Sequence, residues 1–223
     1  MLNCNTCPVY QNCFSYFVKS RDSEIFDKEV KKLQFKKNSL IYSNGQFAEN
    51  IYMIISGEVR LLKEDDLPYP VTMYIAHPGE FIGVAAMAIK NYFTTATALS
   101  DSTICVFNRY VISEILNKSS ENNQLFIRSL FNQIKNISDF SVAMVTGISL
   151  SKVAKALMIL KNKDDKIFIT KEEIASMIGS TRETVSRTIN KLKREGILNI
   201  NRKTITIIDK EKLLELSKET RKN

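Results

Sequence analysis

The sequence predicts an α+β protein built from an antiparallel β-roll, a long dimerisation helix and a winged helix-turn-helix, in that order. Three successive patterns of residue types along the 223 residues indicate this fold. Short apolar runs between turn residues occupy 33–108, an apolar repeat of helical period follows, and strand and helix signals alternate towards the C-terminus. We therefore expect three domains: the cysteine-bearing N-terminus and roll over 1–109, the dimerisation helix over 110–160, and the winged helix-turn-helix over 161–223.

The roll is predicted by short runs of apolar and β-branched residues. Turn-forming pairs separate these runs, among them Asn44-Gly45, Ser56-Gly57 and Pro78-Gly79. Short strands between such turns are typical of an antiparallel roll or barrel. The predicted strands are Ser39–Tyr42, Ile51–Ile55, Val59–Leu62, Val71–Ala76 and Thr103–Phe107.

The long helix carries apolar residues at alternating spacings of three and four. Because this spacing winds two helices around each other, we expect a seam between two copies of the chain. The alternative is an ordinary amphipathic helix that covers the roll with the same face. The predicted seam comprises Ile127, Leu130, Ile134, Ile137, Ser141 and Met144, and the repeat continues to Ile148.

A compact unit follows the polar segment Lys161–Lys166, which we expect to act as a hinge. Ile167–Ile169 predicts a short strand. Thr170, with Glu173 three residues later, predicts a capping box at the start of a helix. Gly179 suits the end of that helix, because glycine readily adopts the left-handed conformation found there.

A second helix is expected from Ser180–Arg182 to about Glu195. Two β-rich runs, Ile197–Ile200 and Thr204–Ile208, then predict a hairpin, and a last helix is expected over Lys210–Thr220. Two helices joined by a tight turn and followed by a two-stranded wing make a winged helix-turn-helix, a motif that reads DNA with its second helix.

The start of this second helix carries residue types suited to base edges. Arginine can bond guanine at O6 and N7, glutamate can accept from cytosine N4, and serine or threonine can meet bases or phosphates. The polar residues share one helical face, whereas Val185, Ile189 and Leu192 face inward. Two alternatives stay open: Ser180 and Glu183 also fit a capping box, and the arginines also suit phosphate clamps. The candidate DNA-binding residues are Ser180, Thr181, Arg182, Glu183, Ser186 and Arg187.

The distribution of charge supports contact with double-stranded DNA. The formal net charge is +8. Residues 1–149 carry 14 Lys/Arg and 14 Asp/Glu, a net charge of zero, whereas residues 150–223 carry 18 and 10, which gives the whole +8. Basic residues gain affinity for phosphate backbones by releasing counterions, although a merely solvated basic surface has the same composition.

The sequence favours a cytoplasmic protein without a membrane span or catalytic site. No apolar run approaches the roughly 18–20 residues that a span needs. The N-terminus lacks the basic and apolar parts of a secretory signal. An enzyme is not expected, because the chain has one histidine and shows no Gly-rich phosphate loop or Ser/His/Asp grouping.

Four cysteines form a second candidate site. Cys4, Cys7 and Cys13 make a C-x2-C-x5-C pattern, and Cys105 lies in the last predicted strand of the roll. Clustered cysteines in a cytoplasmic protein more often bind metal or do redox chemistry than form structural disulfides. An iron–sulfur cluster, zinc and unligated redox thiols all suit this pattern, and His77 offers a weaker candidate haem ligand.

The segments Ile169–Ala175 and Arg182–Arg187 together resemble the DNA-binding signature of the Crp/Fnr transcription regulators. The resemblance covers nearly the whole chain. Glu183, Ser186 and Arg187 match the E-x-x-S-R pattern of the Fnr branch, which implies a half-site resembling TTGA in an inverted repeat. Arg182 is similar to an extra arginine of the cyclic-AMP receptor branch, so the outer bases of the half-site stay open.

The resemblance also implies a role for the cysteines. The oxygen-sensing Fnr branch carries C-x2-C-x5-C near the N-terminus and a fourth cysteine ligand deep in the roll. This implies a homodimeric regulator that senses oxygen or redox state through a [4Fe-4S] cluster on Cys4, Cys7, Cys13 and Cys105. It also implies contact between RNA polymerase and a loop of the roll, such as Lys63–Leu67. A zinc- or thiol-based regulator responding to redox or nitric oxide is the alternative, and a cluster-bearing redox enzyme is a third.

The roll resembles a cyclic-nucleotide-binding jelly roll, but no cyclic nucleotide is expected in it. The glutamate that the family places after Gly83 is Val84 here. The position of the family's arginine, which pairs with the anionic cyclic phosphate, is occupied by Thr94–Thr95 here. Lys90 is the only cationic residue between Gly79 and Ser102. We therefore interpret Glu80 as a turn residue of the roll.

Overall fold

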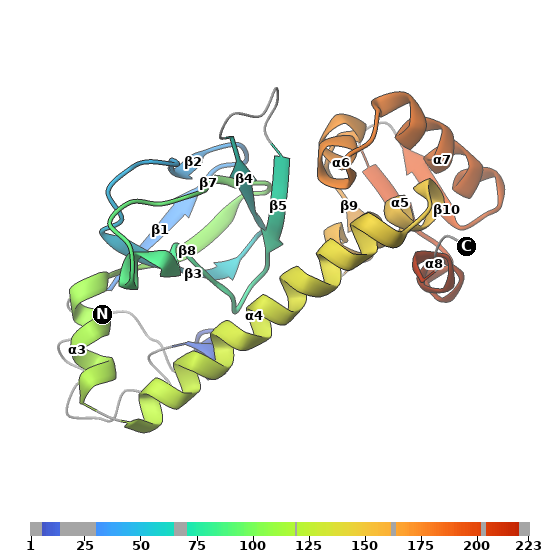
Figure 1. Ribbon diagram of the computed structural model, residues 1–223. Coiled ribbons are helices and arrows are strands. Elements are labelled where there is room, and N and C mark those ends of the chain that lie inside the picture. Colours follow the sequence, from blue (N-terminus) through green and yellow to red (C-terminus); the bar gives the residue numbers. More distant parts are fainter. Residues whose placement is uncertain are drawn as a thin grey trace. The chain divides into compact units, whose positions relative to one another are not determined.

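The structure, a computed structural model, describes residues 6–13, 30–64, 71–118, 120–161, 164–201 and 204–218. The chain divides into two compact units, one of residues 1–69 and 73–136 and the other of residues 70–72 and 137–223. Strands form most of the first unit, and short helices with a small sheet form the second (Figure 1). The predicted fold class, with a β-roll, helices and a winged helix-turn-helix in that order, is confirmed.

Two four-stranded sheets make up the roll. β8 pairs antiparallel with both β1 and β3, and β7 pairs antiparallel with both β2 and β4. All five predicted strands are present. One sheet has the order β1 (Lys31–Phe35), β8 (Ser102–Asn108), β3 (Asn50–Ser56) and β6 (Phe81–Ile82), and the other has the order β2 (Leu40–Tyr42), β7 (Thr95–Ala98), β4 (Val59–Lys63) and β5 (Val71–Ala76).

Three strands, β1, β6 and β7, escaped the sequence analysis because none has a long apolar run. β1 reads Lys-Lys-Leu-Gln-Phe and is almost wholly exposed. β6 is two residues long, and β7 reads Thr-Ala-Thr-Ala. Their strand conformation comes from pairing with neighbours whose own apolar residues are buried, such as Ile104 of β8 and Met53 of β3, both fully buried. Tertiary context therefore decided these three strands.

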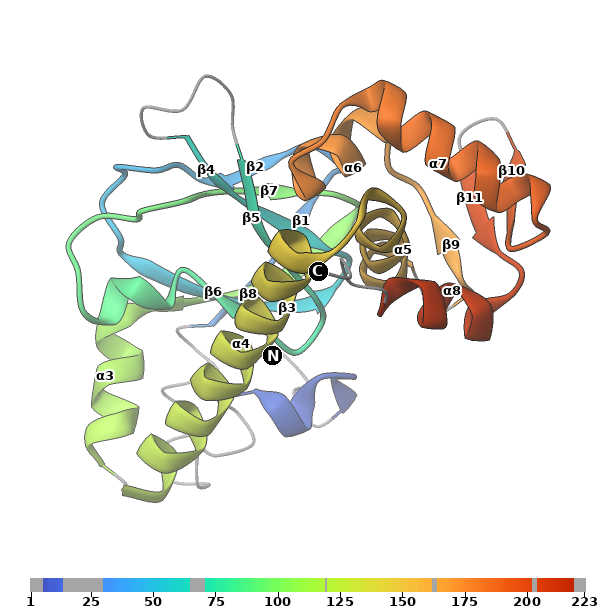
Figure 2. The same cartoon turned by 45° about the vertical axis from the view of Figure 1, so that its right-hand side comes forward.

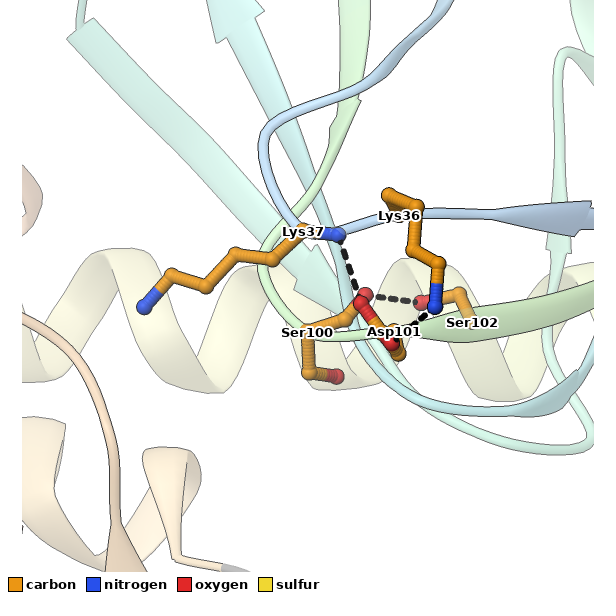
Figure 3. Close-up of polar contacts among 5 residues, drawn as sticks. All are labelled: Lys36, Lys37, Ser100, Asp101 and Ser102. Atoms are coloured by element: carbon orange, nitrogen blue, oxygen red, sulfur yellow. Dashed lines mark hydrogen bonds and ion pairs between the residues drawn. The ribbon is translucent and has the colours of Figure 1, made fainter.

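One carboxylate fixes the turn that carries the chain from β1 in one sheet to β2 in the other. The Lys37 backbone N–H donates to Asp101 Oδ1, and Lys36 Nζ donates to Asp101 Oδ2, each at 2.9 Å (Figure 3). These hydrogen bonds hold the pKa of Asp101 below its usual range, and the one from Lys36 has the largest effect. Asn38 follows with a positive φ of 68° and donates its N–H to Ala98 O at 2.7 Å. The turn thereby connects the two sheets.

The segment expected to form the dimerisation helix is three helices, α3 (Arg109–Asn117), α4 (Ser120–Thr146) and α5 (Ser149–Leu160). α4 ends before Gly147, and glycine is unfavourable inside a helix because it loses the most backbone freedom on folding. Ile148 has extended dihedrals and caps α5, so it does not continue the apolar repeat of α4. The expectation of a repeat that reaches Ile148 was wrong.

The first half of α4 lies against the roll. The rings of Phe126 and Phe81 meet edge to face, with centroids 6.0 Å apart. Gln133 Nε2 donates to Phe81 O at 2.7 Å, and Asn136 Nδ2 donates to Glu80 Oε1 at 3.2 Å. One face of α4 therefore covers the roll, as expected for the alternative of an ordinary amphipathic helix.

The second unit is a winged helix-turn-helix. α6 (Lys171–Ile178) and α7 (Arg182–Arg194) precede a three-stranded sheet with the order β10 (Leu198–Asn201), β11 (Thr204–Ile207) and β9 (Lys166–Ile167). α8 (Lys210–Ser217) follows, and α7 lies beside the β10–β11 hairpin (Figure 2). The predicted capping box of Thr170 and Glu173 is present, and Gly179 ends α6 with a φ of 60°. No helix in the described ranges is long and apolar enough to cross a membrane.

α5 belongs to this second unit, because it packs on α6, α7 and α8 and buries Val153 and Leu157 there. The expected hinge at Lys161–Lys166 therefore lies within one compact unit. Its described residues are held there, because Lys161 Nζ pairs with Asp165 Oδ1 and Ile207 N–H donates to Asp165 O at 2.9 Å. Residues 162 and 163 lie outside the described chain.

Candidate nucleic-acid interface

The exposed face of α7 is lined by polar and charged side chains. Val185, Ile189 and Leu192 are each fully buried, as predicted, and anchor the opposite face of the helix. The exposed face borders an open depression of about 510 Å³. Its lining residues are Arg182, Glu183, Ser186, Arg187, Asn190 and Arg194.

Asn190 and Arg194 were missed by the sequence analysis. They continue the face of Arg187 at helical spacings of three and four, so the periodicity of the helix alone was enough to find them. They lie beyond the E-x-x-S-R motif but still within the helix. The two residues extend the polar face along most of α7.

The residue that caps α7 is Thr181, not Ser180. Its side chain accepts from Thr184 N at 3.2 Å, so the capping box of Ser180 and Glu183 considered above is not formed. Ser180 lies in the turn between the helices and donates its N–H to Ala175 O at 3.0 Å. Since no capping box forms, the Glu183 side chain is not committed to the helix N-terminus.

Two residues at the start of α6 contact the reading residues of α7. Lys171 Nζ donates to Ser186 Oγ at 2.9 Å. Glu172 Oε1 pairs with Arg182 Nε at 2.5 Å. By contrast, Arg187 makes a long contact of 3.5 Å between Nη2 and Thr184 Oγ1, on its own helix. The first helix thus orders part of the polar face of the second.

The exposed apolar stripe on α4 is rotated from the predicted seam. Ile127, Phe131, Ile134 and Val142 are 49, 65, 58 and 57% exposed. The predicted members Leu130 and Ile137 are half-buried and share a face with Phe126 and Gln133. Ser141 is exposed, and its hydroxyl donates to Ile137 O at 2.9 Å. The side chain of Met144 is outside the described residues.

The structure places three of the four cysteines. Cys7 and Cys13 flank the short 3-10 turn η2 (Tyr10–Asn12), and Cys105 is buried in the middle of β8, opposite Met53 of β3. Each of these three is a thiol rather than half of a disulfide. No three Cys, His, Asp or Glu side chains among the described residues are grouped so as to hold a metal ion. Cys4, the fourth predicted ligand, lies outside the described residues.

The interior of the roll near the nucleotide-binding stretch contains tyrosines. The rings of Tyr42 and Tyr92 stack with centroids 4.1 Å apart, and Tyr52 stacks on Tyr42 at 5.5 Å. Burial raises the pKa of Tyr42 to about 12. The 3-10 turn η3 (Val84–Met87) begins at Gly83, where an added Cβ would meet both the Tyr52 and Tyr92 rings at 3.2 Å. Large neutral side chains therefore fill this part of the core.

The positions that correspond to the phosphate-pairing arginine contact other groups. Tyr42 Oη and Thr94 Oγ1 lie 3.4 Å apart, and Thr95 Oγ1 donates to the Glu64 carboxylate at 2.7 Å. A carboxylate at this place repels an anionic phosphate. Glu80 accepts from Tyr74 Oη at 2.6 Å and from His77 N–H at 2.9 Å, which agrees with a turn role.

The remaining members of the predicted sites are only partly visible. His77 is half-buried, and burial lowers its pKa. Most of the loop Lys63–Leu67, proposed to contact RNA polymerase, lies outside the described residues, as do Arg202 and Lys203.

Comparisons with known proteins agree with this architecture. Residues 32–119 match the model of the cyclic nucleotide-binding domain, and residues 151–216 match the Crp-like helix-turn-helix domain. The chain is 23% identical over 232 residues to the anaerobic regulatory protein of Pasteurella multocida, covering 100% of this chain and 85% of the relative. It is 21% identical to the fumarate and nitrate reduction regulatory protein of Escherichia coli, covering 99% and 92%.

Solved structures show the same fold. FixK2 from Bradyrhizobium japonicum superposes with a TM-score of 0.76 at 18% identity, covering 86% of this chain and 99% of that one. The two matched domain models follow one another along this chain, and the relatives align along almost its full length. The protein therefore belongs to the Crp/Fnr family of DNA-binding transcription regulators, which are not enzymes.

Proposed function

We propose that the protein binds an inverted repeat as a homodimer, reads each half-site with α7, and responds to oxygen or redox state through its cysteines. The observation that carries the proposal is the division of α7 into a fully buried apolar face and a polar face open to solvent. A helix held in this way can enter the major groove without losing its own core contacts.

The reading chemistry follows from the residue types on that face. Arg187 is suited to bond guanine O6 and N7, and Glu183 is suited to accept from cytosine N4. Ser186 lies between them on the same face and can meet a base or a phosphate. Ser180 and Thr181, at the N-terminus of α7, suit the phosphate backbone, because helix N-termini favour anions. The match to E-x-x-S-R supports a TTGA-like half-site.

A second copy of the chain is the proposed partner of α4. An inverted repeat calls for two recognition helices related by a two-fold axis. The exposed stripe of Ile127, Phe131, Ile134 and Val142 offers apolar surface for such a pairing. Ile127 and Ile134 belong to the predicted seam, whereas Phe131 enters the proposal from its exposure.

The sensor proposal is a [4Fe-4S] cluster held by Cys4, Cys7, Cys13 and Cys105. It rests on the C-x2-C-x5-C spacing, the fourth cysteine in the roll and the anaerobic regulators among the relatives. Such a cluster would supply an oxygen-labile group whose loss changes the protein. Cys7, Cys13 and Cys105 are thiols rather than disulfides, and no metal-binding group is found among the described residues, so a thiol-based redox sensor is the second candidate.

Selection of bound sequences from a random double-stranded DNA library tests the DNA-binding proposal. We expect an inverted repeat, and we expect Arg187→Ala to lose about 1–3 kcal/mol and its preference for one guanine in each half-site. Lys212→Ala on α8 is the control, since it removes a charge away from α7. Equal weakening of specific and non-specific DNA by Arg187→Ala would make Arg187 a phosphate clamp and contradict base reading.

Anaerobic purification with iron, sulfide and zinc counts tests the sensor proposal. We expect about four iron and four sulfide per chain, bleaching in air, and loss of loading when any of the four cysteines becomes serine. A colourless protein with stoichiometric zinc would contradict it. A metal-free protein whose DNA binding still changes on thiol oxidation would favour the second candidate.

A further inference from the structure

The start of α6 supplies a carboxylate to the recognition helix. Glu172 is the second residue of α6, and Arg182 is the first residue of α7. Their side chains meet across the turn, with Glu172 Oε1 at 2.5 Å from Arg182 Nε. Arg182 also lines the open depression on the polar face of α7. An acidic side chain thus lies at the edge of a surface that otherwise suits phosphate and base contacts.

The atom that Glu172 contacts decides what Arg182 can still do. A guanidinium presents its donors along a side edge, which includes Nε, and along an end edge formed by Nη1 and Nη2. The carboxylate meets the side edge. The end edge is the one whose two parallel N–H groups match O6 and N7 of guanine. Glu172 can therefore hold Arg182 by its side edge and leave the end edge to bond a base.

Stability of the free protein does not account for this ion pair. The side chains of Arg182 and Glu172 are 64 and 57% exposed. Exposed pairs of this kind contribute little, because water and salt screen them and two long side chains lose rotamer freedom. The pair gains importance when DNA covers it, since removing water strengthens charge interactions and a preset arginine loses less freedom on binding.

We propose that Glu172 is a positioning residue that orients Arg182 toward one guanine beyond the bases read by Glu183, Ser186 and Arg187. The inference rests on the proposed function of α7 and adds one read position to each half-site. The neighbouring contact of Lys171 with Ser186 shows that α6 orders a second reading side chain in the same way. The carboxylate lowers affinity for DNA in general and raises selectivity at a single base pair.

Sequence selection with the full-length protein under anaerobic conditions tests this role. The base pair that faces Arg182 is identified first, as the one position whose guanine preference is lost in Arg182→Ala. Binding constants are then measured on duplexes that differ only there, for wild type, Glu172→Ala and Glu172→Gln. Glu195→Ala is the matched control, because Glu195 is an acidic residue at the other end of α7. Its Oε1 lies 3.9 Å from Lys191 Nζ, so it also forms an ion pair.

We expect Glu172→Ala to reduce the guanine preference at that position by ~10-fold while binding to unrelated DNA is unchanged or tighter. Glu172→Gln keeps an acceptor for Nε and should restore part of the preference. In the Arg182→Ala background, Glu172→Ala should have no effect at that base pair. Glu195→Ala should leave the preference as in wild type.

Two results would overturn the inference, and they are distinguishable from failure of the proposed function. An unchanged guanine preference in Glu172→Ala would leave Glu172 without a positioning role. A sharper preference in that variant would show that Glu172 holds Arg182 away from the base. In both cases the selected inverted repeat and its dependence on Arg187 persist, whereas a selection with no sequence preference would overturn base reading by α7 itself.

Discussion

The polar face of α7 and the interior of the roll differ in how the residues that correspond to the family's binding positions are placed. On α7, the residues of the Crp/Fnr signature stand exposed above a buried apolar face. In the roll, the stretch that resembles the nucleotide-binding region packs against Tyr42, Tyr52 and Tyr92, and a glutamate faces the arginine position. Polar side chains of the family's signature therefore remain open to solvent on α7, whereas the corresponding stretch of the roll is used for core packing.

The two regions can diverge because each has its own core. The residues that anchor α7, among them Val185 and Leu192, are buried within the second unit. The tyrosines are buried within the first unit. A change in one core therefore alters stability there without altering which side chains α7 presents.

Tyr42→Ala should give the largest effect and test this independence. Tyr42 is 1% exposed and stacks on Tyr92, so its removal leaves a cavity that should cost about 3–5 kcal/mol of unfolding free energy. Chemical denaturation measures the loss. Tyr110→Ala, at a tyrosine that is 61% exposed, is the control and should cost far less. A changed base preference in folded Tyr42→Ala would show that the core of the roll and the polar face of α7 are not independent.

Ile134→Asp should separate the two copies and show that α7 needs a partner helix. Ile134 is 58% exposed on α4, and burying one isoleucine contributes about 1.5–3 kcal/mol, with two such residues in each dimer. Sedimentation at micromolar concentration should detect monomers, and affinity for the inverted repeat should fall. Asn132→Asp, also exposed on α4, should leave the dimer intact. A stable Ile134→Asp dimer would place the seam elsewhere.

Glu58 should make the stability of the roll depend on pH. Burial raises its pKa from 4.5 to about 7. Because the unfolded chain releases this proton at lower pH, the free energy of unfolding should fall as pH rises from about 4.5 to about 7, and then stay level. Allowing for partial exposure, Glu58→Gln should gain on the order of 1–3 kcal/mol at pH 8 and little at pH 4.

The control for Glu58 is Glu211→Gln on α8, where the side chain is exposed. Denaturation curves of both variants across this pH range separate the local effect from a change in net charge. Equal stability of wild type and Glu58→Gln at pH 8 would show that the carboxylate is not penalised by burial.

Cyclic AMP should have the smallest effect, with no measurable rise in melting temperature. A ligand that binds the folded state stabilises it in proportion to the logarithm of its concentration over Kd, so a millimolar addition is a sensitive test. The tyrosine packing and the Glu64 carboxylate beside Thr95 predict no stabilisation. A clear rise would mean that the roll kept a ligand site despite its changed residues.

The sequence predicted the elements whose signals are local. The capping box at Thr170, the stop at Gly179 and the buried residues of α7 all depend on neighbours a few positions away, and all are confirmed. The alternative of a cap at Ser180 is not formed, because Ser180 and Thr181 are both good caps and only the backbone path decides between them. The break at Gly147 was missed because an apolar repeat masked it.

The E-x-x-S-R match, the four cysteines and the absence of the family's arginine from the roll could all be identified from the sequence alone. The surroundings of these residues depended on the tertiary structure. It paired polar β1 and short β6 with buried partners, turned Leu130 toward the side of Phe126 while Phe131 stayed exposed, and brought Glu172 to Arg182. The physical reason is that composition and spacing act within a few residues, whereas burial and charge pairing depend on neighbours that only folding brings together.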